Sequence, residues 1–124
     1  MLSSHIFVTV LLVCDDTFEI TNTHTPEKTK VSGIKTWNDN DNQDGLRPES
    51  IVVNLYANGT IVGTQVVDAD DNWEYSFIDL PKYSEGNVIQ YTIQEVVVEG
   101  YSTEINGYDI TNSYNFDDLQ LIVL

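Results

Sequence analysis

SIVVNLYANGTIVGTQVV, residues 50–67, decides the fold, because two runs of strand-forming residues flank the pair Asn58-Gly59. Valine, isoleucine, threonine and tyrosine, which recur in these runs, are enriched in β-strands. A two-residue hairpin turn of type I′ needs a positive φ at both central residues, and asparagine and glycine adopt this conformation at little cost. The stretch therefore predicts a β-hairpin made of strands 50–57 and 60–67.

The chain from about residue 30 to residue 114 has the same character throughout. No stretch keeps the 3.6-residue period of an amphipathic helix, and turn-forming residues separate short apolar runs. A second pair, Asn106-Gly107, predicts another type I′ hairpin. Together the runs predict an all-β, seven-stranded β-sandwich. The predicted strands are Lys30–Trp37, Ser50–Ala57, Thr60–Val67, Asn72–Ile78, Asn87–Glu99, Tyr101–Ile105 and Tyr108–Tyr114.

The composition is strongly acidic. Among 124 residues, 20 Asp and Glu stand against 5 Lys and Arg, which gives a formal net charge of −15. Such a surface repels nucleic-acid phosphates and anionic lipid headgroups, so we expect neither nucleic acid nor a membrane surface as a partner. The apolar run Ile6–Cys14 is far shorter than the roughly 20 residues that span a bilayer, so we expect no membrane insertion. No Lys or Arg precedes this run, so a truncated or non-native leader, or a plain β-strand, explains it better than a secretory signal does.

Strand alternation places three polar residues on otherwise apolar faces, since successive side chains of a strand point to opposite sides. These residues and their neighbours are Lys35 with Val31 and Trp37, Glu95 with Ile89, Tyr91, Ile93 and Val97, and Asn112 with Tyr108, Ile110 and Tyr114. Each is costly to bury alone, so the three should meet or lie at edges where they reach water. A buried Lys–Glu ion pair with the asparagine beside it is one outcome.

The other outcome is a covalent crosslink. Burial favours the neutral forms of a lysine and a glutamic acid. A neutral Lys35 amine can attack the side-chain amide carbon of Asn112 while Glu95 polarises the amide and moves protons, and ammonia leaves. If the loop-closure estimate for disulfides carries over, such a staple stabilises the domain by roughly 4 to 5 kcal/mol.

Four blocks of the sequence follow one another with short gaps between them: VSGIKTWNDNDNQDGLRPESIVVNLYANG (31–59), NWEYSFIDLPKY (72–83), YTIQEVVVEGY (91–101) and GYDITNSY (107–114). In this order they resemble the B-type repeat of the collagen adhesin, the Cna-B domain. The resemblance implies a reverse-immunoglobulin, transthyretin-like β-sandwich, used in tandem as a stalk module of Gram-positive adhesins and pilins. It also implies a Lys–Asn isopeptide bond promoted by an acid, with Lys35 and Asn112 as the crosslinked residues and Glu95 as the catalytic one.

The resemblance sets further expectations about the setting of the domain. It implies an extracellular, cell-wall-attached protein whose partners are neighbouring repeats of the same parent chain, with host extracellular matrix bound through other domains. No cofactor is expected, and the reaction is a single turnover on the chain itself rather than enzyme catalysis. No sorting signal of the LPxTG kind follows the domain. Lys82 in LPKYS resembles the lysine by which pilin subunits are joined, but the other residues of that motif are missing.

A repeated tripeptide suggests how the chain is divided. EITNT (19–23) and DITNS (109–113) place Asn22 and Asn112 about 90 positions apart, about the length of one small domain. We therefore expect the complete domain at 30–114, preceded by the last strand of another repeat and a linker at 17–29. Residues 1–16 and 115–124 are expected to be a leader and a tail of uncertain origin.

Two alternative functions stay open. Asn38–Gly45 offers many oxygen ligands for calcium, although Ile51 stands where an EF-hand loop requires a bidentate glutamate. Loop aromatics such as Tyr83 and Tyr101 are candidates for binding a host protein or sugar. An enzyme acting on an external substrate has less support, since both histidines, His5 and His24, fall outside the main domain.

Overall fold

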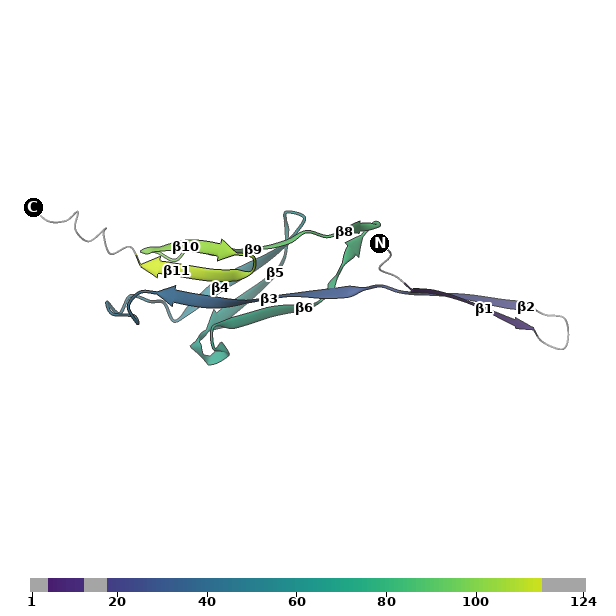
Figure 1. The fold of residues 1–124 in the computed structure, drawn as a ribbon, viewed down its shortest axis with the longest axis horizontal. Coiled ribbons are helices and arrows are strands. Elements are labelled where there is room, and N and C mark those ends of the chain that lie inside the picture. The colour runs from purple at the N-terminus through teal and green to yellow at the C-terminus, as the bar shows by residue number, and fades with distance from the viewer. Residues whose placement is uncertain (1–4, 13–17, 115–124) are drawn as a thin grey trace, which may run out of the picture. The chain divides into compact units, whose positions relative to one another are not determined.

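The computed structural model describes residues 5–12 and 18–114, and these residues form an all-β fold (Figure 1). The chain divides into two compact units, Met1–Thr29 with Asp79–Ile89 and Lys30–Ile78 with Gln90–Leu124. Within the described ranges the helical structure is a single 3-10 turn, η1 (Ala69–Asp71). The predicted all-β class is therefore confirmed.

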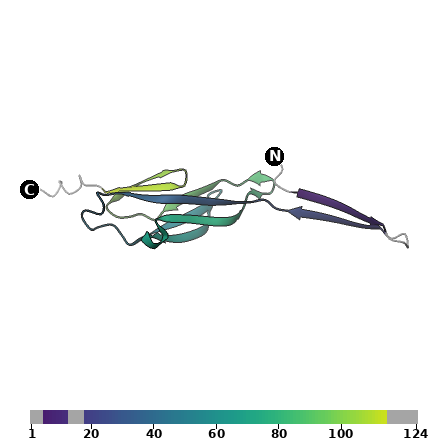
Figure 2. The same cartoon turned by 60° about the horizontal axis from the view of Figure 1, so that its bottom comes forward.

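The larger unit is a sandwich of two sheets, whose strands appear in two views in Figures 1 and 2. One sheet has the strand order β10-β11-β3-β6 and the other has the order β5-β4-β9. In the first sheet, β11 runs parallel to β3, whereas β10 runs antiparallel to β11. The strands of the two sheets are β3 (Lys28–Asn38), β4 (Ser50–Ala57), β5 (Thr60–Asp68), β6 (Glu74–Pro81), β9 (Tyr91–Glu95), β10 (Tyr101–Asn106) and β11 (Asp109–Tyr114).

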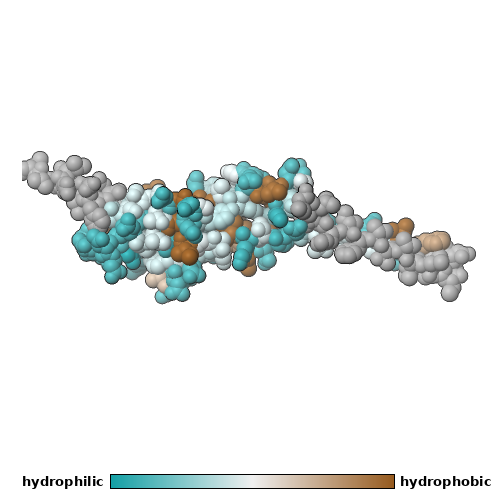
Figure 3. Space-filling model, in the orientation of Figure 1, coloured by the Kyte–Doolittle hydropathy of each residue, from teal (hydrophilic) through white to brown (hydrophobic). Residues whose placement is uncertain are grey.

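The core lies between these two sheets and follows the period-two pattern of the strands. In β4, Ile51, Val53 and Leu55 point inward and are buried, as every second residue of a half-buried strand should be. The other buried apolar residues are Val31, Val67, Tyr75, Ile93, Tyr101 and Ile110. On the face visible in Figure 3, hydrophilic and intermediate residues dominate and the apolar patches are small and separate.

One predicted turn is correct and the other is shifted by one residue. Asn58 and Gly59 have φ values of 50° and 86°, as a type I′ turn between β4 and β5 requires. At the second site Asn106 still pairs with Asp109, so the turn residues are Gly107 and Tyr108. Of these two, Gly107 has the positive φ, 67°, which is the pattern of a type II′ turn with glycine in the first central position.

The predicted strand Asn87–Glu99 is wrong in its extent. The structure ends β9 at Glu95, and Val97, expected on the buried face, is 87% exposed. The reason is topological, because β9 belongs to one sheet and β10 to the other, so residues 96–100 must carry the chain across. Similarly, β6 begins at Glu74 instead of Asn72, since Asn72 and Trp73 both have a positive φ of 56° after the 3-10 turn.

The smaller unit consists of two short hairpins. In one, β1 (His5–Leu12) pairs antiparallel with β2 (Phe18–Thr25), and in the other β7 (Tyr83–Ser84) pairs with β8 (Asn87–Val88). Within 17–29, where the last strand of a preceding repeat and a linker are expected, strand structure runs from Phe18 to Thr25 and resumes at Lys28. Lys82 forms an ion pair of 3.1 Å with Glu27 in this unit.

The apolar run predicted at Ile6–Cys14 supplies the β1 strand over its described part. Cys14 and the expected tail at 115–124 lie outside the described residues, as does the rest of the expected leader. In the part of the chain that is described, no helix is long and apolar enough to cross a membrane.

Candidate functional site

Lys35 enters the site from the middle of β3. Val31 and Lys35 are buried on one face of this strand, with exposed fractions of 2% and 3%, while Ile34 on the opposite face is 51% exposed. The backbone N–H of Lys35 donates to the carbonyl of Trp73 at 2.7 Å, which holds the strand at this point. Alternation therefore directs the lysine side chain into the core, as predicted.

Glu95 meets this lysine from the other sheet. It is the last residue of β9 and lies opposite Val53 of β4. Its Oε2 atom accepts a hydrogen bond from Lys35 Nζ at 2.9 Å, and both side chains are fully buried. Its Oε1 atom accepts a hydrogen bond from the hydroxyl of Thr103 on β10, also at 2.9 Å. Both oxygens of the carboxyl group are thus engaged.

Asn112 is the third predicted residue, and β11 places its side chain in the core. It is fully buried and lies opposite Trp37 in the parallel pairing of β11 with β3. In the same pairing Lys35 lies opposite Ile110, so Lys35 and Asn112 point to the same face, two positions apart in register. By strand spacing their Cα atoms are about 8 Å apart, which is within reach of the four-carbon stem of lysine.

Two side chains of the site hold buried polar atoms without a hydrogen-bond partner among the described residues, the indole of Trp37 and the amide of Asn112. In the amide of Asn112, this holds for both Nδ2 and Oδ1. A buried polar group without a partner costs roughly 1 to 3 kcal/mol, so it calls for an explanation in strain, catalysis or bound solvent. The structure therefore brings a buried ion pair and a buried, unpartnered amide onto one side of the β11-β3 pairing.

Burial and aromatic rings control the charge on Lys35. Desolvation lowers the pKa of Lys35 below its usual value of 10.5, against the opposing effect of the Glu95 carboxyl group. Nζ lies 3.4 Å from the centroid of the Trp37 ring. Trp37 in turn packs edge-on against Trp73 and Tyr101, with ring centroids 5.3 and 5.1 Å away. This aromatic wall keeps water from the amine, and the resulting desolvation favours the neutral, nucleophilic form, whereas the face of the Trp37 ring itself attracts the ammonium.

Sequence reasoning missed a second buried polar cluster next to this wall. Asp39 is buried, and its carboxylate accepts two hydrogen bonds from the Arg47 guanidinium at 2.6 and 3.0 Å. The hydroxyl of Tyr101 and the backbone N–H of Asn42 also donate to it, at 2.8 and 3.0 Å. The hydrogen bonds from Arg47 hold the pKa of Asp39 well below its usual range.

This cluster bears on the expectation of a calcium loop at Asn38–Gly45. The Asp39 carboxylate is directed at an arginine, and Arg47 supplies the positive charge that a cation would bring. Nowhere in the described ranges do three or more histidine, cysteine, aspartate or glutamate side chains form a group able to hold a metal ion. The signal available in the sequence was Arg47 itself, the single arginine of the chain, which follows Asp39 by eight positions.

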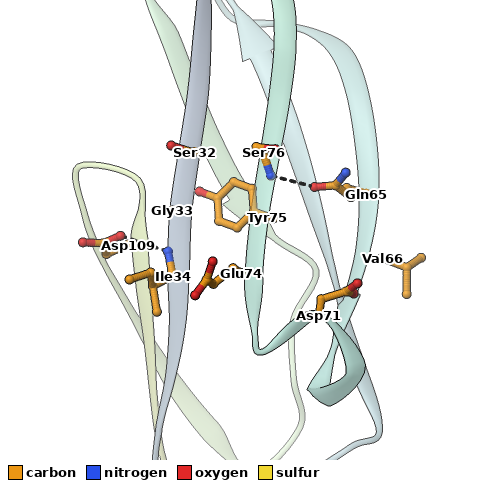
Figure 4. A pocket seen from close by; sticks show the side chains of 10 residues that line it. All are labelled: Ser32, Gly33, Ile34, Gln65, Val66, Asp71, Glu74, Tyr75, Ser76 and Asp109. Atoms are coloured by element: carbon orange, nitrogen blue, oxygen red, sulfur yellow. Dashed lines mark hydrogen bonds between the residues drawn. The ribbon is translucent and has the colours of Figure 1, made fainter.

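A surface cleft lies apart from these residues, among β3, β5 and β6 (Figure 4). The ring of Tyr75 crosses toward Gly33, and its hydroxyl donates to the carbonyl of Tyr108. The amide oxygen of Gln65 accepts a hydrogen bond from the backbone of Ser76 at 3.1 Å. These hydrogen bonds join β6 to β5 of the other sheet and to the turn before β11.

The fold and the site together define a class of protein: a β-sandwich module with a buried lysine, glutamate and asparagine supplied by β3, β9 and β11. Residues 31–113 match the family described as Cna protein B-type domain, so the chain belongs to this family. It is 56% identical over 95 residues to a collagen adhesin of Staphylococcus aureus, an alignment that covers 77% of this chain and 8% of that protein. The chain thus spans a small part of that relative.

Two solved structures from the collagen-binding protein of Staphylococcus aureus are also similar. A structure of two B repeat units has a TM-score of 0.78 and 49% identity, covering 88% of this chain and 29% of that one. A structure of a single B repeat unit has a TM-score of 0.70 and 55% identity, covering 71% of this chain and 47% of that one. The predicted membership of the Cna-B family is therefore confirmed.

Proposed function

We propose that this domain is a structural stalk module of a surface adhesin, stabilised by an autocatalytic isopeptide bond between Lys35 and Asn112. The observation that carries the proposal is the fully buried Asn112 amide, which has no hydrogen-bond partner in the described part of the chain. It shares one face of the sheet with a lysine whose pKa is lowered and whose partner is a buried glutamate. A buried asparagine serving packing alone would be expected to satisfy its amide.

The chemistry is an acyl substitution in which Glu95 carries the protons. Lys35 passes a proton to Glu95 and attacks Cγ of Asn112 as a neutral amine, while the Glu95 acid protonates the amide oxygen. The Cγ–Nδ2 bond breaks as an amide bond to Nζ forms. Two protons from the original Lys35 ammonium end on the leaving nitrogen, which departs as ammonium, and Glu95 returns to its starting carboxylate. The domain reacts once with itself and is no enzyme in the usual sense.

The relatives support a proposal for the setting of the module. The similar proteins are described as a collagen adhesin and as repeat units of a collagen-binding surface protein. We place this domain, residues 30–114, in an extracellular, cell-wall-attached protein beside neighbouring repeats, with 17–29 as the end of a preceding one. Any contact with host extracellular matrix is assigned to other domains of the parent.

The test is the intact mass of the folded chain. The crosslink removes one ammonia, so the mass should fall about 17 Da below that of the sequence, and fragmentation should yield a branched peptide joining Lys35 to Asn112. Lys35→Ala, Glu95→Ala and Asn112→Ala should each restore the full mass and lower the thermal stability. Lys30→Ala, at an exposed lysine of the same strand, is the matched control and should keep the mass loss. A folded wild-type chain of full mass would overturn the proposal.

A further inference from the structure

Thr103 makes a contact that the reaction as described above does not use. It lies on β10, at the edge of its sheet, and its hydroxyl donates to Glu95 Oε1 at 2.9 Å. Lys35 occupies the other oxygen of the same carboxyl group, also at 2.9 Å. Thr103 therefore completes the hydrogen bonding of the glutamate from the side opposite the lysine.

The strand register adds a second relationship. Thr103 lies directly opposite Asn112 in the antiparallel pairing of β10 with β11. Residues opposite each other in such a pair point to the same face and have Cβ atoms about 4.5 to 5.5 Å apart. One hydroxyl group is thus bonded to the proposed proton carrier and stands on the strand next to the proposed acyl acceptor.

The position of Thr103 also explains how a glutamate at the end of an edge strand stays dry. β9 and β10 are edge strands of different sheets, and the chain crosses between the sheets over residues 96–100. Glu95 is nevertheless fully buried in its side chain, whereas Thr103 is exposed. The threonine stands between the carboxyl group and solvent at this open edge of the sandwich.

We propose that Thr103 is a positioning residue for the crosslinking reaction, holding the Glu95 carboxyl group so that one oxygen faces Lys35 while the group can reach Asn112. This inference rests on the proposed function. A hydroxyl group suits the task because it can keep donating to Oε1 while Oε2 is charged and after Oε2 has taken the proton from Lys35. It therefore supports Glu95 both before and after the proton leaves Lys35. A methyl group in its place would leave the carboxyl group free to turn.

The experiment measures the rate of crosslinking in the full chain. The chain is prepared unreacted by peptide ligation in denaturant, folding is started by dilution, and timed samples are quenched in acid for intact mass. Tryptophan fluorescence follows folding separately, so that slow chemistry is distinguished from slow folding. Thr103→Val removes the hydroxyl group and keeps the β-branched shape that strands favour. Thr111→Val is the matched control, because Thr111 lies on the opposite face of β11 from Asn112.

We expect Thr103→Val to slow ammonia loss about tenfold or more, the change produced by losing about 1.4 kcal/mol of transition-state stabilisation. Thr103→Ser, which restores a hydroxyl group, should react within about twofold of the wild-type rate, and Thr111→Val should match the wild type. Should the valine variant fail to fold, Thr103→Ala tests the same loss of the hydroxyl group.

The outcomes separate the two proposals. If the wild-type chain crosslinks and the valine or alanine variant keeps the same rate, the role of Thr103 is overturned while the crosslink stands. If Thr103→Ser loses ammonia as slowly as Thr103→Val does, a role for the hydroxyl group is likewise contradicted. If the folded wild-type chain loses no ammonia, the proposed function itself fails, and the role of Thr103 fails with it.

Discussion

Trp37 of β3 and Asn112 of β11 lie directly opposite each other in the parallel pairing of the first and last strands of the larger unit. This register directs the asparagine amide and the Lys35 side chain to the same buried face. A slip of one residue would turn Asn112 outward, because side chains alternate between the two faces of a strand. The chemistry proposed for the site therefore depends on strand pairing between residues far apart in the sequence.

The buried ion pair should show strong coupling when the crosslink is prevented. In an Asn112→Ala background, Lys35→Met and Glu95→Gln should each lower the free energy of unfolding by roughly 3 to 5 kcal/mol. The reason is that each substitution leaves the other charged group buried without its partner. The double variant Lys35→Met/Glu95→Gln should lose clearly less than the sum of the two. Urea denaturation of the four proteins gives the coupling energy. Additive losses would mean that the two side chains do not support each other.

The lowered pKa of Lys35 predicts a rise of stability with pH in the same Asn112→Ala background. Because burial lowers this pKa below 10.5, the unfolded chain binds more protons than the folded one between the folded-state pKa and 10.5. The free energy of unfolding attributable to Lys35 should therefore increase through this window. The pKa of Tyr101 is raised to about 12, so its titration lowers the free energy of unfolding as the pH rises above 10. The measurement has to cancel this contribution of Tyr101.

The measurement for this prediction is a difference between two proteins. Urea denaturation at several pH values compares Asn112→Ala with Asn112→Ala/Lys35→Met, in which Tyr101 is unchanged. As the pH rises toward 10.5, the free energy of unfolding of Asn112→Ala should increase relative to that of Asn112→Ala/Lys35→Met. A flat difference across the window would show that the lysine pKa is not lowered in the folded state.

The Asp39–Arg47 pair predicts a local dependence on acid. Asp39→Asn should destabilise the domain by about 2 kcal/mol at neutral pH, the scale of hydrogen bonds to charged groups. The pKa of Asp39 is lowered from 3.8, so the stability it contributes is present above 3.8 and is lost as the pH falls below this value. The gap between wild type and variant, measured by urea denaturation, should therefore narrow in acid. Asp44→Asn, at an exposed position of the same loop, should change little at any pH.

Gly33 should tolerate no side chain. A Cβ atom at this position would overlap the carbonyl oxygen of Tyr108 and lie 2.7 Å from the Tyr75 hydroxyl, which donates a hydrogen bond to that oxygen. Figure 4 shows the Tyr75 ring beside Gly33. Gly33→Ala should therefore lower the free energy of unfolding by more than 2 kcal/mol, toward the upper end of overpacking costs. Gly63→Ala is the matched control, because its nearest neighbour is the movable Phe77 ring at 3.2 Å. If Gly33→Ala and Gly63→Ala lower the melting temperature equally, the claim that the Tyr75–Tyr108 contact excludes a side chain at Gly33 is refuted.

Local sequence patterns predict most of the strands and the buried direction of two site residues. Alternation along β3 and β11 predicts that Lys35 and Asn112 point inward, and both are buried. The Asn58-Gly59 hairpin is correct because its turn depends on two adjacent residues. Where prediction fails, distant parts of the chain decide: Val97 continues an apolar pattern, yet it lies on the crossing between sheets and is exposed.

The sequence by itself determined the all-β class, the hairpins whose turns are local, and the inward direction of the polar residues, because these follow from φ preferences and a two-residue period. Tertiary structure decided between the outcomes that the sequence left open, because it brings Glu95 and Lys35 together in a buried pair. It alone decided that Thr103 bonds Glu95, that Arg47 and Tyr101 bond Asp39, and that Asn112 has no partner among the described residues. These contacts join residues from different sheets or loops. Their existence depends on how the sheets pack and in which register the strands pair, which no local pattern specifies.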